Sequence, residues 1–369
     1  MINVLHVIND LSVGGAETLV TELLPVLKDK GINCDLLLLD GRETHLTRIL
    51  SEKFNISVYS IGTRINIYNP LIIFKLPPFI RNYDIVHSHL FPTQYWIALA
   101  KVLFFVRTRL VTTEHSTVNR RRKRLIFKLL ERYIYKKYET IIAVSDAAGQ
   151  NLRIHLNDFS SKIRVINNGI NLSSIFEARP FEKKEILNIS IENARLILMV
   201  SRFFAAKDHS TLINAMLYLP ENIHLILVGD GELKPFFINL VKEKNLQNRV
   251  HFLGIRHDVY RILKSVDIIV MSSIYEGLSM SSLEGMASGR PFLASDVSGL
   301  HEIVKDAGIL FEPGNSIQLA NEISLLLEDE NLYKSISEKC LEKAKQYDIS
   351  VTAGSYLEIY TTRASDPEV

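Results

Sequence analysis

Two glutamates separated by seven residues, Glu276 and Glu284, are the strongest candidates for ligand chemistry in this sequence. Between them, Gly277 lets the backbone approach a ligand closely, and the residues from Ser279 onward have the pattern of a helix start. Free amide hydrogens and a partial positive charge at a helix N-terminus suit a diphosphate. We predict that Glu284 binds a ribose and that Glu276 binds a sugar. The diphosphate would lie against the loop of Gly277, Leu278, Ser279, Met280 and Ser281. The alternative is a pair of solvated carboxylates at a helix end.

Two cations, Arg202 and Lys207, follow an apolar run at residues 196–200. Cations preset beside a departing diphosphate stabilise the negative charge that develops on it. The alternative, two basic surface residues at a helix start, would place positive charge against the helix dipole. The sequence contains no Asp-x-Asp motif, which would supply oxygen ligands for a divalent metal at the diphosphate. We therefore expect a metal-independent reaction that uses no cofactor.

The elements that must position these residues are apolar strands that alternate with helices. Short apolar runs occur at residues 4–8, 36–39, 85–87, 110–113 and 140–144, and again at residues 196–200, 224–228, 250–253, 268–271 and 291–294. Strands that alternate with helices of about ten residues or more predict parallel sheets with helices on both faces. Ligands of such sheets lie beyond the carboxyl ends of the strands, which is where the candidate residues fall.

The charged and aperiodic residues 173–193 separate the two series of strands and are interpreted as a linker. We therefore predict an α/β protein with two doubly wound, Rossmann-like domains that face a central cleft. The first domain would take residues 1–175 and the second residues 190–345. Residues 346–369 are expected to form a helix that crosses back to the first domain, followed by a tail.

The order of several short motifs is similar to that of one enzyme family. The spacing of Glu276 and Glu284, followed by Gly289-Arg290-Pro291 and Gly299-Leu300-His301-Glu302, resembles the retaining glycosyltransferases of the GT-B fold, family 4. Further motifs extend the resemblance over nearly the whole chain: Gly14-Gly15-Ala16-Glu17, Asn167-Asn168-Gly169-Ile170-Asn171, and Ser201-Arg202 with Lys207-Asp208. Residues 278–281 depart from the family's common Phe-Pro-x-x pattern, so the donor sugar stays open.

The resemblance implies roles for residues of the first, acceptor-side domain. His115 would face the donor sugar across the cleft, although a lone histidine after a strand is more often a core residue. Gly14 and Gly15 would lie near the leaving phosphate, where the alternative is a tight turn into a helix. Glu17 would contact the acceptor. No residue stands out as a nucleophile.

In the second, donor domain, the backbone near Gly254 and Arg256 would read the nucleotide base. The catalytic residues implied are His115, Arg202, Lys207 and Glu276. The expected activity is transfer of a hexose from a UDP- or GDP-sugar, with retention, to a lipid-linked saccharide in bacterial surface polysaccharide biosynthesis. The alternatives are a nucleotide-sugar epimerase on the same scaffold and a non-catalytic nucleotide-sugar-binding protein.

A run of cations precedes a helical pattern that includes Lys128; it consists of Arg120, Arg121, Arg122, Lys123 and Arg124. Basic and apolar residues at helical spacing indicate a helix on a membrane surface, and each cation near an anionic leaflet contributes about 1 kcal/mol. The alternative is a solvated helix face. Nucleic acid is not expected as a partner, because no aromatic residues interleave the run and the net charge is only +2.

Composition and apolar segments bound the location of the chain. Hydrophobic residues make up 47% and charged residues 23% of the sequence, as in ordinary globular proteins. No signal-peptide pattern occurs at the start, and the longest apolar stretch, residues 95–106, is shorter than the roughly 20 residues of a membrane span. We expect a cytoplasmic protein that is peripheral on the inner face of the membrane.

Overall fold

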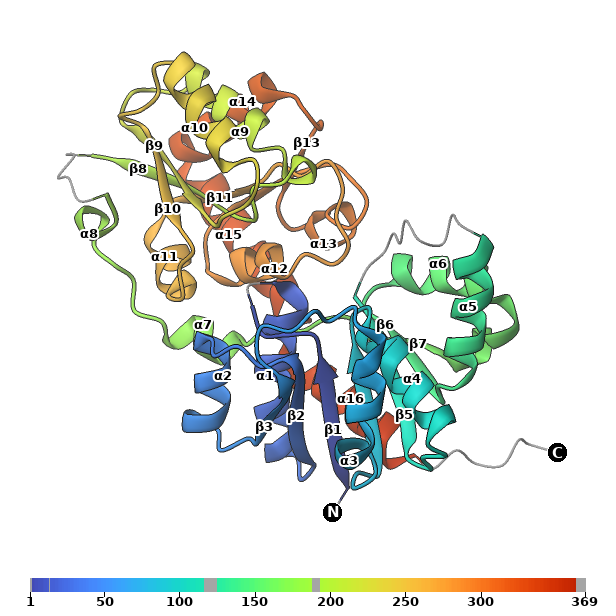
Figure 1. Ribbon diagram of the computed structural model, residues 1–369. Helices are drawn as coiled ribbons and strands as arrows, with labels where there is room; N and C mark the ends of the chain where they lie inside the picture. The colour runs from blue at the N-terminus through green and yellow to red at the C-terminus, as the bar shows by residue number, and fades with distance from the viewer. Residues whose placement is uncertain (1, 13, 116–124, 188–192, 363–369) are drawn as a thin grey trace. The chain divides into compact units, whose positions relative to one another are not determined.

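The computed structural model describes residues 2–12, 14–115, 125–187 and 193–362, and the chain forms two compact units. The first unit contains Met1–Gly169 and Ile349–Val369, and the second contains Ile170–Asp348. Each unit is built on one parallel sheet covered by helices (Figure 1). The predicted class of two doubly wound, Rossmann-like domains is therefore confirmed.

The first unit contains a seven-stranded sheet in the order β3-β2-β1-β4-β5-β6-β7. Its strands are β1 (Asn3–Ile8), β2 (Asn33–Asp40), β3 (Val58–Gly62), β4 (Ile85–His89), β5 (Arg109–Glu114), β6 (Thr140–Ala143) and β7 (Ile163–Val165). Its α-helices are α1 (Gly15–Asp29), α2 (His45–Arg48), α3 (Pro77–Ile80), α4 (Thr93–Leu103), α5 (Leu125–Lys136), α6 (Asp146–Leu156) and α16 (Ile349–Thr361). The unit also contains a π-helix, η1 (Ile49–Lys53), and two 3-10 helices, η2 (Pro70–Lys75) and η4 (Asn157–Lys162).

The second unit contains a six-stranded sheet in the order β10-β9-β8-β11-β12-β13. Its strands are β8 (Arg195–Val200), β9 (Ile223–Val228), β10 (Val250–Gly254), β11 (Ile268–Met271), β12 (Phe292–Ser295) and β13 (Ile309–Phe311). Its α-helices are α7 (Leu172–Glu177), α8 (Lys183–Leu187), α9 (His209–Ala215), α10 (Lys234–Glu243), α11 (Val259–Ser265), α12 (Met280–Ala287), α13 (His301–Val304), α14 (Ser316–Glu328) and α15 (Glu330–Lys345), with the turns η5 (Ala205–Lys207) and η6 (Met216–Tyr218).

Three strands that the sequence pattern did not indicate, β3, β7 and β13, all lie at sheet edges. An edge strand needs fewer buried side chains than a central one, and each of these strands has a single buried residue. β3 and β7 therefore lack the continuous apolar run that marked the central strands, and the apolar run of β13 is only three residues long, Ile309–Phe311.

The boundary between the units differs from the predicted one. The first unit ends at Gly169, and residues 173–187, interpreted from the sequence as a linker, belong to the second unit. Here α7 contacts α11 and α12, the amide of Phe181 donates to Ser265 Oγ at 2.7 Å, and Lys183 Nζ donates to Asp267 Oδ2 at 2.7 Å. The charge and lack of periodicity of this segment had suggested a linker, but Lys183 forms an ion pair with Asp267, the residue before β11.

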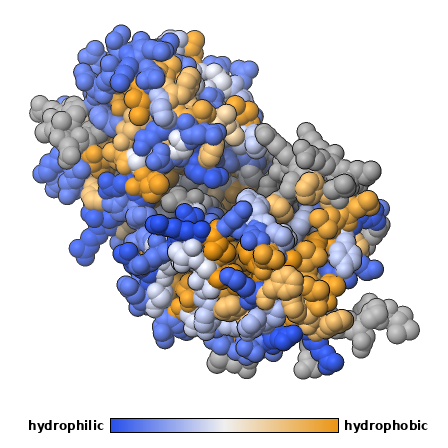
Figure 2. All heavy atoms as spheres, in the orientation of Figure 1, coloured by the Kyte–Doolittle hydropathy of each residue, from blue (hydrophilic) through white to orange (hydrophobic). Residues whose placement is uncertain are grey.

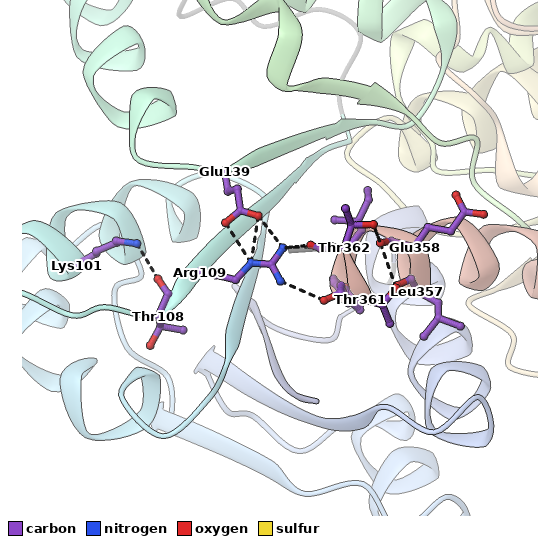
Figure 3. A network of polar contacts seen from close by, with 10 residues as sticks. Lys101, Thr108, Arg109, Glu139, Leu357, Glu358, Thr361 and Thr362 are labelled. Carbon is purple, nitrogen blue, oxygen red and sulfur yellow. Dashed lines mark hydrogen bonds and ion pairs between the residues drawn. The ribbon is translucent and has the colours of Figure 1, made fainter. Parts of the chain in front are cut away.

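The carboxy-terminal helix α16 belongs to the first unit, where it packs against α1. Arg109, at the start of β5, donates to the carbonyl oxygens of Ile359, Tyr360 and Thr362 at 2.9–3.3 Å (Figure 3). The same guanidinium pairs with Glu139 at 2.6 Å. The last carbonyls of a helix lack partners within the helix and carry negative partial charge, so this arginine satisfies and stabilises that end of α16.

Candidate functional site

The second unit brings its two main motifs together at the centre of its sheet. Strands β8 and β11 are neighbours, and from this pair the chain runs outward in opposite directions, through β9 and β10 on one side and β12 and β13 on the other. Such a reversal of strand order leaves a crevice beyond the carboxyl ends of the two strands, where open α/β sheets bind ligands. Arg202 and Lys207 follow β8, and residues 276–284 follow β11. Both motifs therefore lie at the reversal point.

An ion pair joins the two motifs directly. Lys207 Nζ is in hydrogen-bonding contact with Glu276 Oε1, and Ser273 Oγ donates to the same oxygen at 2.8 Å. The two charged side chains are only 20% and 11% exposed, so each is largely removed from water and stabilises the other. The lysine keeps two further N–H donors. The arrangement can therefore bind a sugar hydroxyl and an anion at one place.

The loop that carries Glu276 is held by close backbone contacts. Ile274 donates its amide hydrogen to the carbonyl of Ala206 at 2.8 Å, which ties this loop to the one after β8. Gly299, at φ +87°, approaches so closely that a Cβ there would lie 2.3 Å from the carbonyl oxygen of Gly277. A glycine is required at this contact for both its conformation and its lack of a side chain.

Helix α12 begins beside this loop and carries the second glutamate. Ser279 caps the helix by accepting from the amide of Ser282 at 3.4 Å, so the segment from Ser279 does start a helix. Glu284 is buried on α12, and the hydroxyl of Tyr260 donates to its Oε1 at 3.3 Å. A buried carboxylate with a hydroxyl donor already beside it is suited to bind further hydroxyl groups.

Arg202 is exposed, and its guanidinium lies 5.0 Å from the centre of the Phe204 ring. The loop after β8, which carries Arg202, packs closely against the turn after β9. A Cβ on Gly231 of that turn would lie 2.6 Å from the carbonyl oxygen of Phe203. The guanidinium is therefore presented to solvent at the end of β8 rather than packed into the unit.

Gly254 is the last residue of β10, and Arg256 follows it. β10 is an edge strand two positions away from β8. Gly254 has φ +67°. The Arg256 guanidinium donates two hydrogen bonds to the carboxylate of Asp258 at 2.6 and 2.7 Å, and this pairing lowers the pKa of that carboxyl. Helix α11 starts at the next residue and carries Tyr260, whose hydroxyl reaches Glu284. The loop is thus connected to the ribose candidate through Tyr260.

The first unit has its own reversal point, between β1 and β4. Gly14 is the N-cap of α1, which follows β1, and a Cβ there would lie 2.2 Å from Glu17 Oε2. Asn9 bridges the loops after both strands, since it donates to the carbonyl of Phe91 at 2.9 Å and accepts from Thr93 Oγ1 at 2.7 Å. Gly15 is the first residue of α1. Gly14, Gly15 and Glu17 therefore form a single turn at this point.

His115 follows β5, and its Nε2 lies 3.1 Å from Nδ1 of His89 at the end of β4. Burial lowers the pKa of His115 to about 4, so the ring is neutral near pH 7. Its Nδ1 is buried and has no hydrogen-bond partner among the described residues. His89 was not among the residues expected from the sequence. The signal for it is the His87-Ser88-His89 spacing, because alternate residues of a strand point to one face.

The basic run at residues 120–124 lies outside the described residues, and Lys128 falls within α5. In the described part of α5, Leu129, Leu130 and Tyr133 are exposed. Lys137 Nζ lies 4.6 Å from the centre of the Tyr133 ring. Among the described helices, none combines the length and the apolar character that crossing a membrane requires.

Two family models match successive parts of the chain. The model described as Glycosyltransferase Family 4 matches residues 13–174, and the model described as Glycosyl transferases group 1 matches residues 181–343. The first match covers most of the first structural unit but not residues 1–12 or 349–369, and the second match covers most of the second unit.

Two similar curated proteins are bacterial transferases. The chain is 27% identical over 358 residues to the N-acetylgalactosamine-N,N'-diacetylbacillosaminyl-diphospho-undecaprenol 4-alpha-N-acetylgalactosaminyltransferase of Campylobacter jejuni, which covers 92% of this chain and 94% of that protein. It is 29% identical over 275 residues to the UDP-Gal:alpha-D-GlcNAc-diphosphoundecaprenol alpha-1,3-galactosyltransferase of Escherichia coli, covering 71% and 70% of the two chains. Both names specify a diphospho-undecaprenol acceptor.

Solved structures share the fold. Anabaena Alr3699/HepE in complex with UDP and glucose matches with a TM-score of 0.83 and 22% identity, covering 97% of this chain and 99% of that one. TarM matches with a TM-score of 0.75 and 15% identity over 98% and 99% of the two chains. These likenesses establish a shared arrangement of strands and helices.

Proposed function

Because this chain belongs to the group 1 glycosyltransferases of the GT-B fold, it is a transferase enzyme, and we propose that it moves a hexose from a UDP- or GDP-sugar to a lipid-linked saccharide. We further propose that the anomeric configuration is retained and that the product belongs to a bacterial surface polysaccharide. The named relatives support the class of acceptor, because they act on saccharides linked to diphospho-undecaprenol.

The observation that carries the proposal is the joining of two motifs at the reversal point of the second sheet. Lys207 and Glu276 come from the segments after the adjacent strands β8 and β11, and the buried Glu284 lies on α12, which follows β11. In the proposed complex, Glu284 binds the ribose hydroxyls and Glu276 binds the transferred sugar. Lys207 and Arg202 bind the diphosphate, together with the amides at the start of α12.

The proposed reaction breaks the bond between the anomeric carbon and the diphosphate oxygen, and that oxygen keeps the electron pair. A hydroxyl oxygen of the acceptor forms the new bond to the anomeric carbon and loses its proton. The products are the lengthened saccharide, a nucleoside diphosphate and one proton.

Lys207, Arg202 and the helix dipole stabilise the charge on the leaving group, which is why we propose that no divalent metal is needed. Full activity in excess EDTA is the expected result, and loss of activity that Mg²⁺ restores would contradict it.

The role of Glu284 is tested with a nucleotide-sugar panel and two variants. A ligand that binds the native state raises the melting temperature, so a thermal-shift screen of UDP- and GDP-sugars identifies the donor. Glu284→Gln is expected to weaken binding of that donor by roughly tenfold to a hundredfold, because it removes a charged acceptor for ribose hydroxyls. Glu243→Gln, an exposed change on α10, is the control. Equal donor affinity in the two variants would show that Glu284 does not bind the donor.

Contact with a membrane surface is supported by exposed apolar residues of the first unit. Leu71 and Phe74 of η2 are 62% and 61% exposed, and Phe105, just after α4, is 89% exposed. Figure 2 shows apolar residues gathered on the first unit in the region of α4. Lys75 and Lys101 lie on the same two elements. η2 packs against α4, and exposed apolar side chains that gather in one region are typical of membrane or protein contact sites.

Sedimentation with lipid vesicles tests this contact. The protein is expected to sediment with vesicles rich in an anionic lipid and to be released by salt, because screening weakens attraction between exposed charges and the leaflet. Replacing Phe74 and Phe105 by serine should reduce sedimentation several-fold, while Ile154→Ser, an equally exposed apolar position on α6, should not. Equal sedimentation of all three proteins would contradict the proposal.

A further inference from the structure

A chain of hydrogen-bonded side chains runs from His115 into the core of the first unit. His115 Nε2 lies 3.1 Å from His89 Nδ1, and His89 Nε2 lies 3.0 Å from His6 Nδ1. His6 Nε2 lies 3.2 Å from the hydroxyl of Tyr360 on α16. These four residues, called here the histidine chain, span β1, β4, the end of β5 and the carboxy-terminal helix. His6, His89 and Tyr360 are buried.

The arrangement follows from the strand register. His6 of β1 is opposite His87 of β4, and His89 is two residues further along the same strand. All three side chains therefore lie on one face of the sheet, the face on which Tyr360 of α16 covers them. Leu5 and Val7 alternate with His6 and join the apolar core on the other face.

His6 and His89 of the histidine chain, together with His87, also have nitrogen atoms within 4.8 Å of one another. A metal would need their lone pairs, which lie in the ring planes, to converge. All six ring nitrogens are instead in hydrogen-bonding contact with other side chains. His6 contacts His89 and Tyr360, and His89 also contacts His115. His87 contacts Tyr360 and Thr113. The cluster is organised for hydrogen bonds rather than for a metal.

The protons of the histidine chain can be counted. A neutral imidazole has one N–H donor and one acceptor nitrogen, and burial lowers the pKa values of all three histidines, so each ring is neutral. Every contact needs one hydrogen. If the hydrogen-bond partner of the Tyr360 hydroxyl hydrogen is known, then His6, His89 and His115 in turn each have only one tautomer that satisfies their contacts. The tautomer of His115 is therefore set by a tyrosine on another element.

The contacts of Tyr360 indicate where its hydrogen lies. Its oxygen is 2.5 Å from His87 Nδ1 but 3.2 Å from His6 Nε2. Hydrogen bonds donated by a hydroxyl are shorter than those donated by a ring N–H, and a phenol is a stronger donor than a neutral imidazole. Tyr360 thus donates to His87 and accepts from His6 Nε2–H. His6 Nδ1 then accepts from His89 Nε2–H, and His89 Nδ1 accepts from His115 Nε2–H.

We propose that Tyr360, His6 and His89 are positioning residues that hold His115 as the Nε2–H tautomer, with Nδ1 as a free acceptor. The consequence for transfer rests on the proposed function. His115 Nδ1 is buried without a described partner, and as an acceptor it can receive a hydrogen bond from a sugar hydroxyl. It cannot bind an ionised phosphate oxygen, which has no hydrogen to donate. The tautomer itself follows from the first unit alone and does not depend on that function.

Nitrogen-15 NMR of protein labelled in its histidine rings tests the proposal. Couplings between ring nitrogens and ring protons show which nitrogen of His115 carries hydrogen, and His115→Gln assigns its signals among the 11 histidines. The wild-type protein is expected to show Nε2–H. Tyr360→Phe removes the hydrogen-bond partner of His6 Nε2. The hydrogen bonds among His6, His89 and His115 can then be donated in either direction, so His115 should show both tautomers.

Tyr356→Phe is the matched control. Tyr356 lies one turn earlier on α16, is equally buried, and its hydroxyl contacts Thr113 Oγ1 at 3.0 Å rather than a member of the histidine chain. Thr113 Oγ1 also lies 2.7 Å from His87 Nε2, and it can still accept a hydrogen bond from that nitrogen when the Tyr356 hydroxyl is removed. This variant should keep the wild-type tautomer. Turnover should fall by roughly threefold to tenfold in Tyr360→Phe and stay near wild type in Tyr356→Phe.

Each outcome decides one of the two proposals. Nδ1–H in the wild type overturns the proposal even if Tyr360→Phe does not fold, and so does an unchanged tautomer in a folded Tyr360→Phe protein. If no nucleotide sugar is bound or consumed, the proposed function fails while the NMR result still stands. If transfer occurs but the tautomer is Nδ1–H, only the positioning proposal fails.

Discussion

At the scale of single residues, the candidate site depends on an ion pair between two motifs. Lys207 and Glu276 are 69 positions apart in sequence, yet Lys207 Nζ is in hydrogen-bonding contact with Glu276 Oε1. Their separate roles were predicted from the residue types and the turns that carry them. Their contact was not predicted, because it depends on which strands become neighbours. The pair holds both side chains in place before a ligand arrives, which reduces the entropy lost on binding.

Replacing the cation tests this pair. Lys207→Met keeps the length of the side chain but leaves Glu276 with Ser273 as its described hydrogen-bond donor. We expect the affinity for the nucleotide-sugar donor to fall by roughly tenfold to a hundredfold, because a hydrogen bond to a charged group contributes about 1.5–3 kcal/mol. Calorimetric titration measures the change.

Lys242→Met, at an exposed position of α10, is the control for loss of a positive charge. If both variants bind the donor as tightly as the wild type, Lys207 is not a ligand of the diphosphate.

At the scale of elements, the loops after β11 and β12 support each other through glycines. Sequence pattern located both loops at strand ends, but it did not show that Gly299 meets the backbone of Gly277. A glycine in a sequence indicates only that some conformation or contact excludes a side chain. The neighbouring backbone decides which of the two applies.

Two alanine substitutions separate these causes. Gly289 and Gly299 have φ of +77° and +87°, so Gly→Ala at either position destabilises the fold by about 1–2 kcal/mol. At Gly289 an added Cβ meets nothing within 4 Å, whereas at Gly299 it would lie 2.5 Å from the carbonyl oxygen of Glu276. Gly299→Ala should therefore also displace Glu276 and weaken donor binding by at least about tenfold.

Urea denaturation and donor titration of both variants measure these effects. Gly289→Ala should lose stability and keep the affinity for the donor. Equal affinity in both variants would show that the Gly299 contact does not position Glu276.

At the scale of the whole molecule, the first unit carries an unusual group of buried neutral histidines. Burial lowers the pKa of His6 to about 3 and that of His115 to about 4, and it lowers the pKa values of His87 and His89 well below the ordinary value. In the unfolded chain these groups titrate near pH 6.5. The unfolded state therefore binds more protons than the folded state at mildly acidic pH.

The sign of the pH dependence follows from this difference. The free energy of unfolding has its full value above about pH 6.5 and falls as the pH decreases toward the folded pKa values of about 3 to 4. Each histidine should contribute a loss of about 1 kcal/mol between about pH 7 and pH 5.5. The single tryptophan, Trp96, lies on α4 in the first unit and reports its unfolding by fluorescence in urea. An unfolding midpoint that does not change over this interval would contradict the neutral state of the histidines.

The sequence by itself determined the class of the fold, the central strands and the residue types of the donor site. Apolar runs recur wherever a strand is buried on both faces, and turn residues after those runs mark the ends where ligands bind. Edge strands such as β7 lack that signal because they need fewer buried side chains.

Only the tertiary structure decided which of these residues meet. The order of strands placed the loops after β8 and β11 side by side and thereby created the contact of Lys207 with Glu276. The register of β1 with β4, together with α16, assembled His6, His89 and Tyr360 from positions up to 354 residues apart. The physical reason is that buried polar groups must find partners, and which partners lie within reach is a property of packing rather than of local sequence.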